Sequence, residues 1–173
     1  VSAVKACIKK TGYLYADTHS TQPVKLDAYN GKKAEFIISG DKLFVKSFDD
    51  SNDTFSLFRH TVTNGVVSAA EMLDTSIKAC NIIGADVWYR RSVTGSSLCD
   101  LYKYSTEKEK IDGDVASFAG LSDGSVLIVK NFVSSSDGEI ADLYLYDGKK
   151  TSLVAEKAEL KNMKYSDKGI SFI

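Results

Sequence analysis

A repeat of about forty residues constrains the fold of this chain more than any other feature of its sequence. Residues 100–104 (Asp-Leu-Tyr-Lys-Tyr) recur 42 residues later as residues 142–146 (Asp-Leu-Tyr-Leu-Tyr). Weaker copies lie at 56–60 and at 25–33. Repeats of this length are typical of architectures in which each unit buries its apolar surface only against its neighbours.

A second sequence motif recurs with nearly the same spacing as the first. The turn Ser-Asp-Gly at 122–124 precedes the apolar run 126–129, and a related turn at 166–169 precedes the apolar run 170–173. Together the two motifs predict one array of repeats across the whole chain, at about 1–34, 35–75, 76–115 and 116–159, with a half repeat at 160–173.

Each repeat has the sequence pattern of β-strands. Apolar, β-branched and aromatic residues form short runs that end at Gly, Asp, Asn or Ser. Asn64-Gly65 and Asp147-Gly148 lie between such runs, and both residues of each pair tolerate the positive φ of a tight hairpin. The most complete repeat predicts four strands, at 116–121, 126–132, 141–146 and 151–156.

Four antiparallel strands in a period of about 40–45 residues correspond to one blade of a β-propeller. We therefore predict an all-β chain, a propeller-like array of about four four-stranded antiparallel blades. The first repeat is about one strand short, and residues 160–173 predict only two strands. Either those two strands pair with the first repeat and close a small ring, or the chain is a segment of a larger propeller that associates to complete itself. The segment is favoured, because an apolar strand ending at Phe172-Ile173 would leave an exposed edge.

The Ser-Asp-Gly turn before an apolar strand, followed by Asp-Leu-Tyr-Leu-Tyr-Asp-Gly at 142–148, resembles the bacterial TolB-type, WD40-like propeller repeats. It is also similar to the propellers of uncharacterised bacterial envelope and surface proteins. The resemblance covers nearly the whole chain. It implies that Asp and Gly form the turns, that the alternating aromatic residues pack between blades, and that the protein is extracytoplasmic or at the cell surface. It carries over no binding residue.

Composition excludes several classes of protein. Twenty-two Lys and Arg against 23 Asp and Glu give a net charge of −1, which argues against a nucleic-acid partner. The longest apolar runs have the length of a strand, so no membrane span is expected in this segment. Cys7 and Cys80 occupy matching repeat positions and are expected to be small buried thiols, too far apart for a disulfide, while Cys99 lacks a CxxC partner.

The acidic run around Asp49, Asp50 and Asp53 has the oxygen ligands of a Ca²⁺ loop. It lacks the glycine and the closing glutamate of the EF-hand pattern, so a solvated hairpin loop is the simpler interpretation. These aspartates are the only metal candidates, and we expect no cofactor.

Trp88, Arg90 and Arg91 are the candidate binding residues, because Trp and Arg are enriched at interface hot spots. Strand alternation predicts Trp88 and Arg90 on one face, and Tyr89 and Arg91 on the other. The competing interpretation packs Trp88 between blades and leaves the arginines at the rim.

No catalytic residue is predicted. His60 occupies the position of Tyr104 and Tyr146 in other repeats, which indicates packing. His19 and Asp17 are an acid/base candidate, but no motif positions a nucleophile beside them.

These observations favour a non-catalytic binding or scaffold module for a protein or a glycan. The first alternative is a propeller enzyme, a glycosidase or a peptidase-associated domain, which would need two or more converging carboxylates. The predicted channel-lining strands carry Lys5, Lys78 and Lys161 but little acid, which weighs against an enzyme. The second alternative is a sensor or accessory domain of a larger envelope protein.

Overall fold

The computed structural model describes residues 6–10, 13–17, 24–26, 29, 33–49, 53–166 and 169–172. The chain divides into two compact units, Val1–Lys78 and Ala79–Ile173, and each is described by itself. Regular structure in the described residues is β-strand, apart from short 3-10 turns. The prediction of an all-β chain is therefore confirmed.

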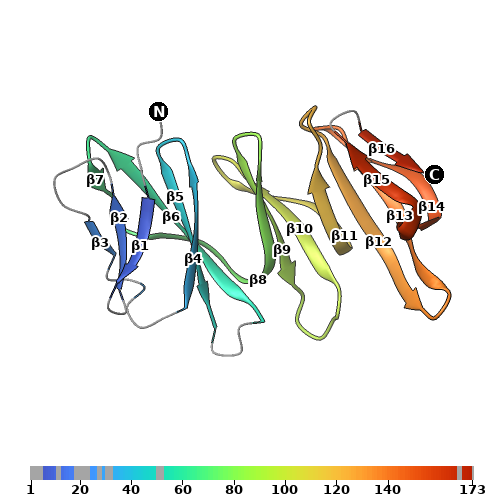
Figure 1. The fold of residues 1–173 in the computed structure, drawn as a ribbon, viewed down its shortest axis with the longest axis horizontal. Coiled ribbons are helices and arrows are strands. Elements are labelled where there is room, and N and C mark those ends of the chain that lie inside the picture. Colours follow the sequence, from blue (N-terminus) through green and yellow to red (C-terminus); the bar gives the residue numbers. More distant parts are fainter. Residues whose placement is uncertain are drawn as a thin grey trace. The chain divides into compact units, whose positions relative to one another are not determined.

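The first unit holds a small sheet and the start of a larger one (Figure 1). The small antiparallel sheet consists of β1 (Ala6–Lys10), β2 (Tyr13–Asp17) and β3 (Val24–Leu26). The larger sheet begins with β4 (Ala34–Ser39), β5 (Lys42–Phe48), β6 (Phe55–Thr63), β7 (Val66–Val67) and β8 (Glu71–Ile83). All the pairs formed by these strands within the unit are antiparallel.

The second unit continues the same antiparallel order. Its strands are β9 (Asp86–Ser92), β10 (Cys99–Tyr104), β11 (Lys108–Gly120), β12 (Val126–Ser135), β13 (Gly138–Tyr146) and β14 (Thr151–Glu159). The 3-10 turn η2 (Leu160–Asn162) leads to the separate hairpin of β15 (Met163–Ser166) and β16 (Gly169–Phe172). Hydrogen bonding runs in sequence order from β4 to β14, with β7 beside β6, and this sheet is not closed.

Two turns illustrate how the sequence sets the hairpins. Asn64 and Gly65 have φ of 50° and 79°, so both residues of this tight turn have the predicted positive φ. At the second predicted turn only Gly148 has positive φ, at 95°. There the Asp147 carboxylate accepts the backbone N–H groups of Lys149 and Lys150, which forms a different turn from the predicted one.

The long strands β8, β11 and β14 are each interrupted by a non-glycine residue with positive φ: Ser76 (56°), Asp114 (57°) and Lys157 (50°). In β11 the interruption separates two sets of hydrogen bonds. Residues 108–115 pair with β10, and residues 115–120 pair with β12. One continuous strand therefore ends one meander and begins the next.

In the second unit, the first part of β12 is buried on both of its faces. Residues 126–129 are all buried, as expected for a strand covered on both sides. On one face Val126 and Ile128 join a cluster that includes Trp88 of β9. On the other face Leu127 and Val129 form a second cluster. Because the first cluster joins residues of β8 to β11 with residues of β12 and β13, the two meanders of this unit pack face to face.

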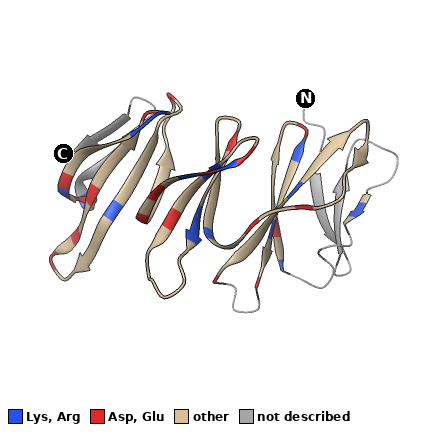
Figure 2. Ribbon diagram, turned by 180° about the vertical axis from the view of Figure 1, so that it is seen from behind, with Lys and Arg blue, Asp and Glu red and all other residues tan. Residues whose placement is uncertain are grey.

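Charged side chains of both signs are interspersed along the described strands (Figure 2). In the second unit they pair between neighbouring strands. Lys130 Nζ lies 2.9 Å from Asp112 Oδ1, and Lys103 Nζ lies 3.1 Å from Asp86 Oδ2. These pairs are partly exposed and link adjacent strands, and ion pairs that remain accessible to solvent contribute little to stability.

The core of the first unit contains a polar pair. His60 and Tyr29 are 3% and 1% exposed, and 2.8 Å separates His60 Nε2 from the Tyr29 hydroxyl. His60 Nδ1 lies 2.8 Å from the carbonyl oxygen of Ser68. Because a carbonyl only accepts, Nδ1 donates to Ser68 and Nε2 accepts from Tyr29. The burial of His60 agrees with its predicted packing role.

Removing the Tyr29 hydroxyl is expected to lower the free energy of unfolding by about 2 kcal/mol, because Tyr29→Phe leaves a buried imidazole nitrogen without its donor. Urea unfolding followed by far-UV circular dichroism measures the loss. Tyr102→Phe is the control, because that half-buried hydroxyl reaches only Asp100, at 3.5 Å. Equal losses for the two variants would contradict the assigned hydrogen bond.

Candidate functional site

The hairpin of β12 and β13 extends beyond the core of the second unit (Figure 1). Every residue of β12 from Asn131 to Ser135 is exposed, in contrast to the buried run at 126–129. The change coincides with positive φ at Asn131 and with a register shift between Lys130 and Val133. A bulge of this kind re-aims the rest of a strand.

Two exposed apolar side chains lie on one face of this extension. Val133 is 52% exposed, and its direct cross-strand partner Ile140 is 36% exposed. Ile140 is also opposite Glu159 of β14, so all three side chains point to the same face.

Two adjacent hollows follow this face. The tip hollow, of about 250 Å³, is lined by Ser135, Asp137, Gly138, Glu139, Ile140, Glu159 and Lys161. The base hollow, of about 280 Å³, is lined by Asn131, Val133, Ile140, Ala141, Asp142 and Lys157. Because they share Ile140, we treat them as one surface and call it the hairpin groove.

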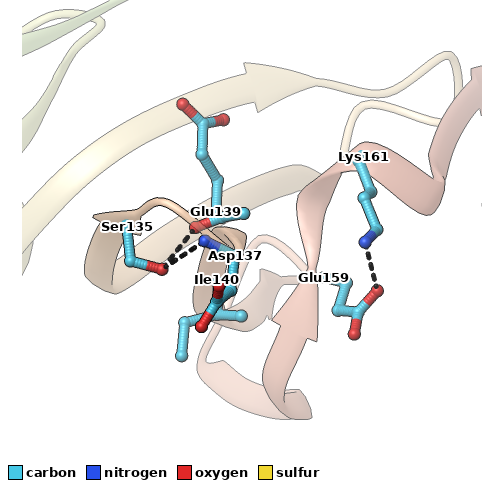
Figure 3. Close-up of a pocket in the computed structure, with 7 residues that line it drawn as sticks. Ser135, Asp137, Glu139, Ile140, Glu159 and Lys161 are labelled. Atoms are coloured by element: carbon cyan, nitrogen blue, oxygen red, sulfur yellow. Dashed lines mark hydrogen bonds and ion pairs between the residues drawn. The ribbon is translucent and has the colours of Figure 1, made fainter.

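The tip of the groove is held by a local turn (Figure 3). The Ser135 hydroxyl donates to the carbonyl oxygen of Gly138 at 3.2 Å and accepts the N–H of Asp137 at 3.3 Å. On the β14 side, Lys161 Nζ lies 3.4 Å from Glu159 Oε2, and both side chains are more than half exposed. Glu139 extends from the hairpin away from this ion pair (Figure 3).

The base of the groove is anchored by Asp142. One carboxylate oxygen accepts from the Asn131 side-chain amide at 2.7 Å, and the other accepts the backbone N–H of Lys157 at 2.8 Å. The same aspartate therefore stabilises the bulge in β12 and the interruption in β14. The hydrogen bond from Asn131, followed by that from the Lys157 N–H, lowers the pKa of the Asp142 carboxyl.

This lowered pKa predicts a pH-dependent contribution to stability. The ionised carboxylate is the bonded form, so its contribution is complete above the unfolded-state pKa of about 3.9 and is lost as the pH falls through the lower folded-state value. We expect Asp142→Ala to be less stable than wild type at pH 7, and the difference to shrink below about pH 4. Urea unfolding at a series of pH values measures it; a difference independent of pH would contradict the assignment.

A separate hollow, of about 410 Å³, lies in the first unit. Phe48, Phe55 and Phe58 line it together with Asp49 and five hydroxyl residues, Ser47, Thr54, Ser56, Thr75 and Ser76. We call it the phenylalanine hollow.

Two of the three rings of the phenylalanine hollow, Phe48 and Phe55, are in contact, and each has a lysine beside it. The centroids of Phe48 and Phe55 are 5.4 Å apart. Lys33 Nζ lies 4.7 Å from the centre of the Phe48 ring, and Lys46 Nζ lies 5.5 Å from that of Phe55. The Thr54 hydroxyl donates to Asp49 and holds this carboxylate at the rim.

The two surfaces occupy corresponding places in their own meanders. The phenylalanine hollow lies where the β5–β6 connection meets the interruption of β8 at Ser76. The hairpin groove lies where the β12–β13 turn meets the interruption of β14 at Lys157.

The structure places the predicted binding residues away from both surfaces. Trp88 is 3% exposed and packs edge-on against Tyr146, with ring centroids 5.5 Å apart. Arg90 and Arg91 are half-buried, and neither lines the hollows described above. Tyr89 stacks on Tyr102. Trp88 therefore packs in the hydrophobic core of the second unit.

Of the three predicted metal candidates, the structure describes Asp49 and Asp53. Asp49 closes the connection between β5 and β6, where its N–H donates to the Thr54 carbonyl oxygen at 3.1 Å. Asp53 is exposed, and Asp50 lies outside the described residues. In the part of the chain that the structure describes, no three His, Cys, Asp or Glu side chains are grouped to hold a metal ion.

The remaining predicted residues give a mixed result. Cys99 is buried, but Cys80 is only half-buried, so the expected buried thiol at that position is not found; neither of these two cysteines forms a disulfide. His19 and the side chains of Cys7 and Asp17 lie outside the described part. No helix within the described ranges has the length and apolar character needed to cross a membrane.

The sequence carries one signal for the hairpin groove that lies outside its repeat motifs. Phe132-Val133 and Ile140 flank a turn rich in serine, so apolar residues continue past the point where the buried run ends. Neither the models of known protein families nor the curated proteins match the chain. Its function is therefore inferred from the geometry of the two surfaces.

Proposed function

We propose that the chain is an array of propeller blades of the TolB-like type, each meander forming one blade. Two observations support this architecture. The interruptions at Ser76, Asp114 and Lys157 lie within two residues of the predicted repeat boundaries at 75, 115 and 159. The two meanders of the second unit also pack face to face, as neighbouring blades do. An experimental structure in which consecutive meanders do not surround a common axis would overturn it.

We further propose that the protein is a non-catalytic binding module and that the hairpin groove binds an extended segment of a partner protein. The observation that carries this proposal is the exposed pair Val133 and Ile140 on a hairpin that leaves the core. Apolar side chains gathered beside polar hollows mark interaction sites. Extended segments bind well along strands, because their alternate side chains enter successive hollows.

The carboxylates of the groove support binding rather than hydrolysis. Both oxygens of Asp142 accept hydrogen bonds from neighbouring groups, and Glu159 is paired with Lys161. An acid/base pair of a glycosidase needs one carboxyl group with a raised pKa, whereas the pKa of Asp142 is lowered.

A displayed library of random twelve-residue peptides tests the proposal. We expect peptides that bind the wild type with a Kd in the range of about 1–100 µM and lose about tenfold or more with Ile140→Ser. Leu153→Ser is the matched control, because Leu153 is 48% exposed on β14 and lines neither hollow. If no selected peptide depends on Ile140, the groove is not a binding site.

The phenylalanine hollow favours a second candidate function, the binding of a neutral sugar. Apolar rings beside several hydroxyl groups and one carboxylate match the apolar faces and hydroxyl groups of a pyranose. Titration with glucose, N-acetylglucosamine and cellobiose, followed by NMR, tests it. We expect saturable shifts in wild type and in Phe36→Ala, a control at an exposed ring outside the hollow, and no shifts in Phe48→Ala. The absence of shifts in wild type would exclude these sugars.

A further inference from the structure

The charges at the tip of the hairpin groove indicate which peptides it selects. Of the seven residues that line the tip hollow, Asp137, Glu139 and Glu159 are acidic and Lys161 alone is basic, which gives a formal charge of −2. In the base hollow Asp142 and Lys157 cancel. The negative charge is therefore at one end of the groove, next to Ile140.

The ion pair formed by Lys161, the one basic residue that lines the tip hollow, is exposed to solvent. Lys161 and Glu159 are 3.4 Å apart with side chains 60% and 56% exposed, and exposed pairs of this kind contribute little. No hydrogen bond or ion pair within the described ranges engages the Glu139 carboxylate. A cation supplied by a partner can therefore approach the Glu139 carboxylate, and its contact with Glu159 would compete only with an exposed ion pair to Lys161 among the contacts named above.

The distance along the strand from Ile140 to the tip hollow determines which positions of a bound segment face the apolar pair and which face the acidic tip. Ile140 belongs to both hollows, and Gly138, two residues nearer the turn, lines only the tip hollow. Two residues of extended chain span about 6.6 Å, and residues two apart share one face. An extended segment that packs an apolar side chain against Val133 and Ile140 therefore presents its second-next side chain to the acidic tip.

We propose that the hairpin groove selects protein segments in which a lysine or arginine lies two positions from an apolar residue. This inference rests on the proposed peptide-binding function and adds the chemistry of the partner. Arginine is the better cation, because its planar guanidinium binds a carboxylate through two parallel hydrogen bonds, whereas lysine acts as a point charge.

The same peptide library tests this selectivity. Among peptides that depend on Ile140, we expect Lys or Arg two positions from an apolar residue to be enriched about threefold or more over the unselected library, and binding to weaken about threefold or more between 0.05 and 0.5 M NaCl. The enrichment should disappear with Glu159→Gln combined with Asp137→Asn. It should persist with Glu156→Gln, which removes a charge from the same strand but does not line the groove.

The outcomes separate the two proposals. Peptides that depend on Ile140 but show no enrichment in basic residues, or a preference for acidic ones, overturn the selectivity and leave the binding function intact. An enrichment that the double variant does not remove also overturns it, because the acids at the tip would then not be its cause. If no peptide depends on Ile140, both proposals fail.

Discussion

Leu101→Ala is expected to lower the free energy of unfolding by about 2–5 kcal/mol, the range for truncating a fully buried leucine. Leu101 is 0% exposed and belongs to the cluster through which the two meanders of the second unit pack together. The truncation removes apolar contacts and leaves a cavity between two sheet faces. Strands fixed by hydrogen bonds to both neighbours cannot move far enough to fill it.

Unfolding in guanidinium chloride, followed by the fluorescence of the single tryptophan, measures this loss. Trp88 lies in the same cluster, so its emission reports directly on the packing that Leu101 supports. Leu153→Ala is the control: Leu153 is 48% exposed, and we expect a change within about 0.5 kcal/mol. A loss below about 1 kcal/mol for Leu101→Ala would show that the two faces are not closely packed.

The strands could be predicted from the sequence where apolar residues alternate or run together between turn residues. The predicted strands at 126–132 and 141–146 fall within β12 and β13. Their buried positions are occupied by apolar residues, which the sequence shows directly. The predicted strand at 116–121 covers only the last five of the thirteen residues of β11 and runs one residue past its end. Nothing in the sequence shows that Asp114 adopts positive φ and joins two meanders without a loop, because aspartate is as common in ordinary turns.

The candidate site could be predicted less well, since it depends on contacts between distant residues. Trp88 has the residue type of a binding hot spot, but its ring packs against Tyr146, 58 positions away, and no local pattern reveals this. The hairpin groove depends on the bulge at Asn131 and on Asp142 bonding to Lys157. Such bonds between strands follow from register, which the sequence of one strand does not specify.

Gly120→Ala is expected to destabilise the protein by about 3 kcal/mol, the upper part of the range for overpacking a well-packed core. A Cβ atom at Gly120 would lie 2.7 Å from Cγ1 and 2.8 Å from Cγ2 of Ile83. Ile83 is 9% exposed, and its β-branched side chain has few alternative rotamers. Moving it away from a new Cβ atom would therefore cost free energy. The missing side chain at Gly120 therefore allows β11 to approach β8.

A double-mutant cycle separates this clash from an effect on the backbone. Ile83→Ala removes all three side-chain atoms that the new Cβ would meet, so Gly120→Ala should cost at least about 1 kcal/mol less in that background than in wild type. Denaturant unfolding of the four proteins gives the coupling energy. If Gly120→Ala costs the same with and without the Ile83 side chain, the close approach of β8 and β11 is wrong. If Gly120→Ala costs less in the Ile83→Ala background, as expected, a glycine is required at this position for close packing between neighbouring meanders rather than for a turn.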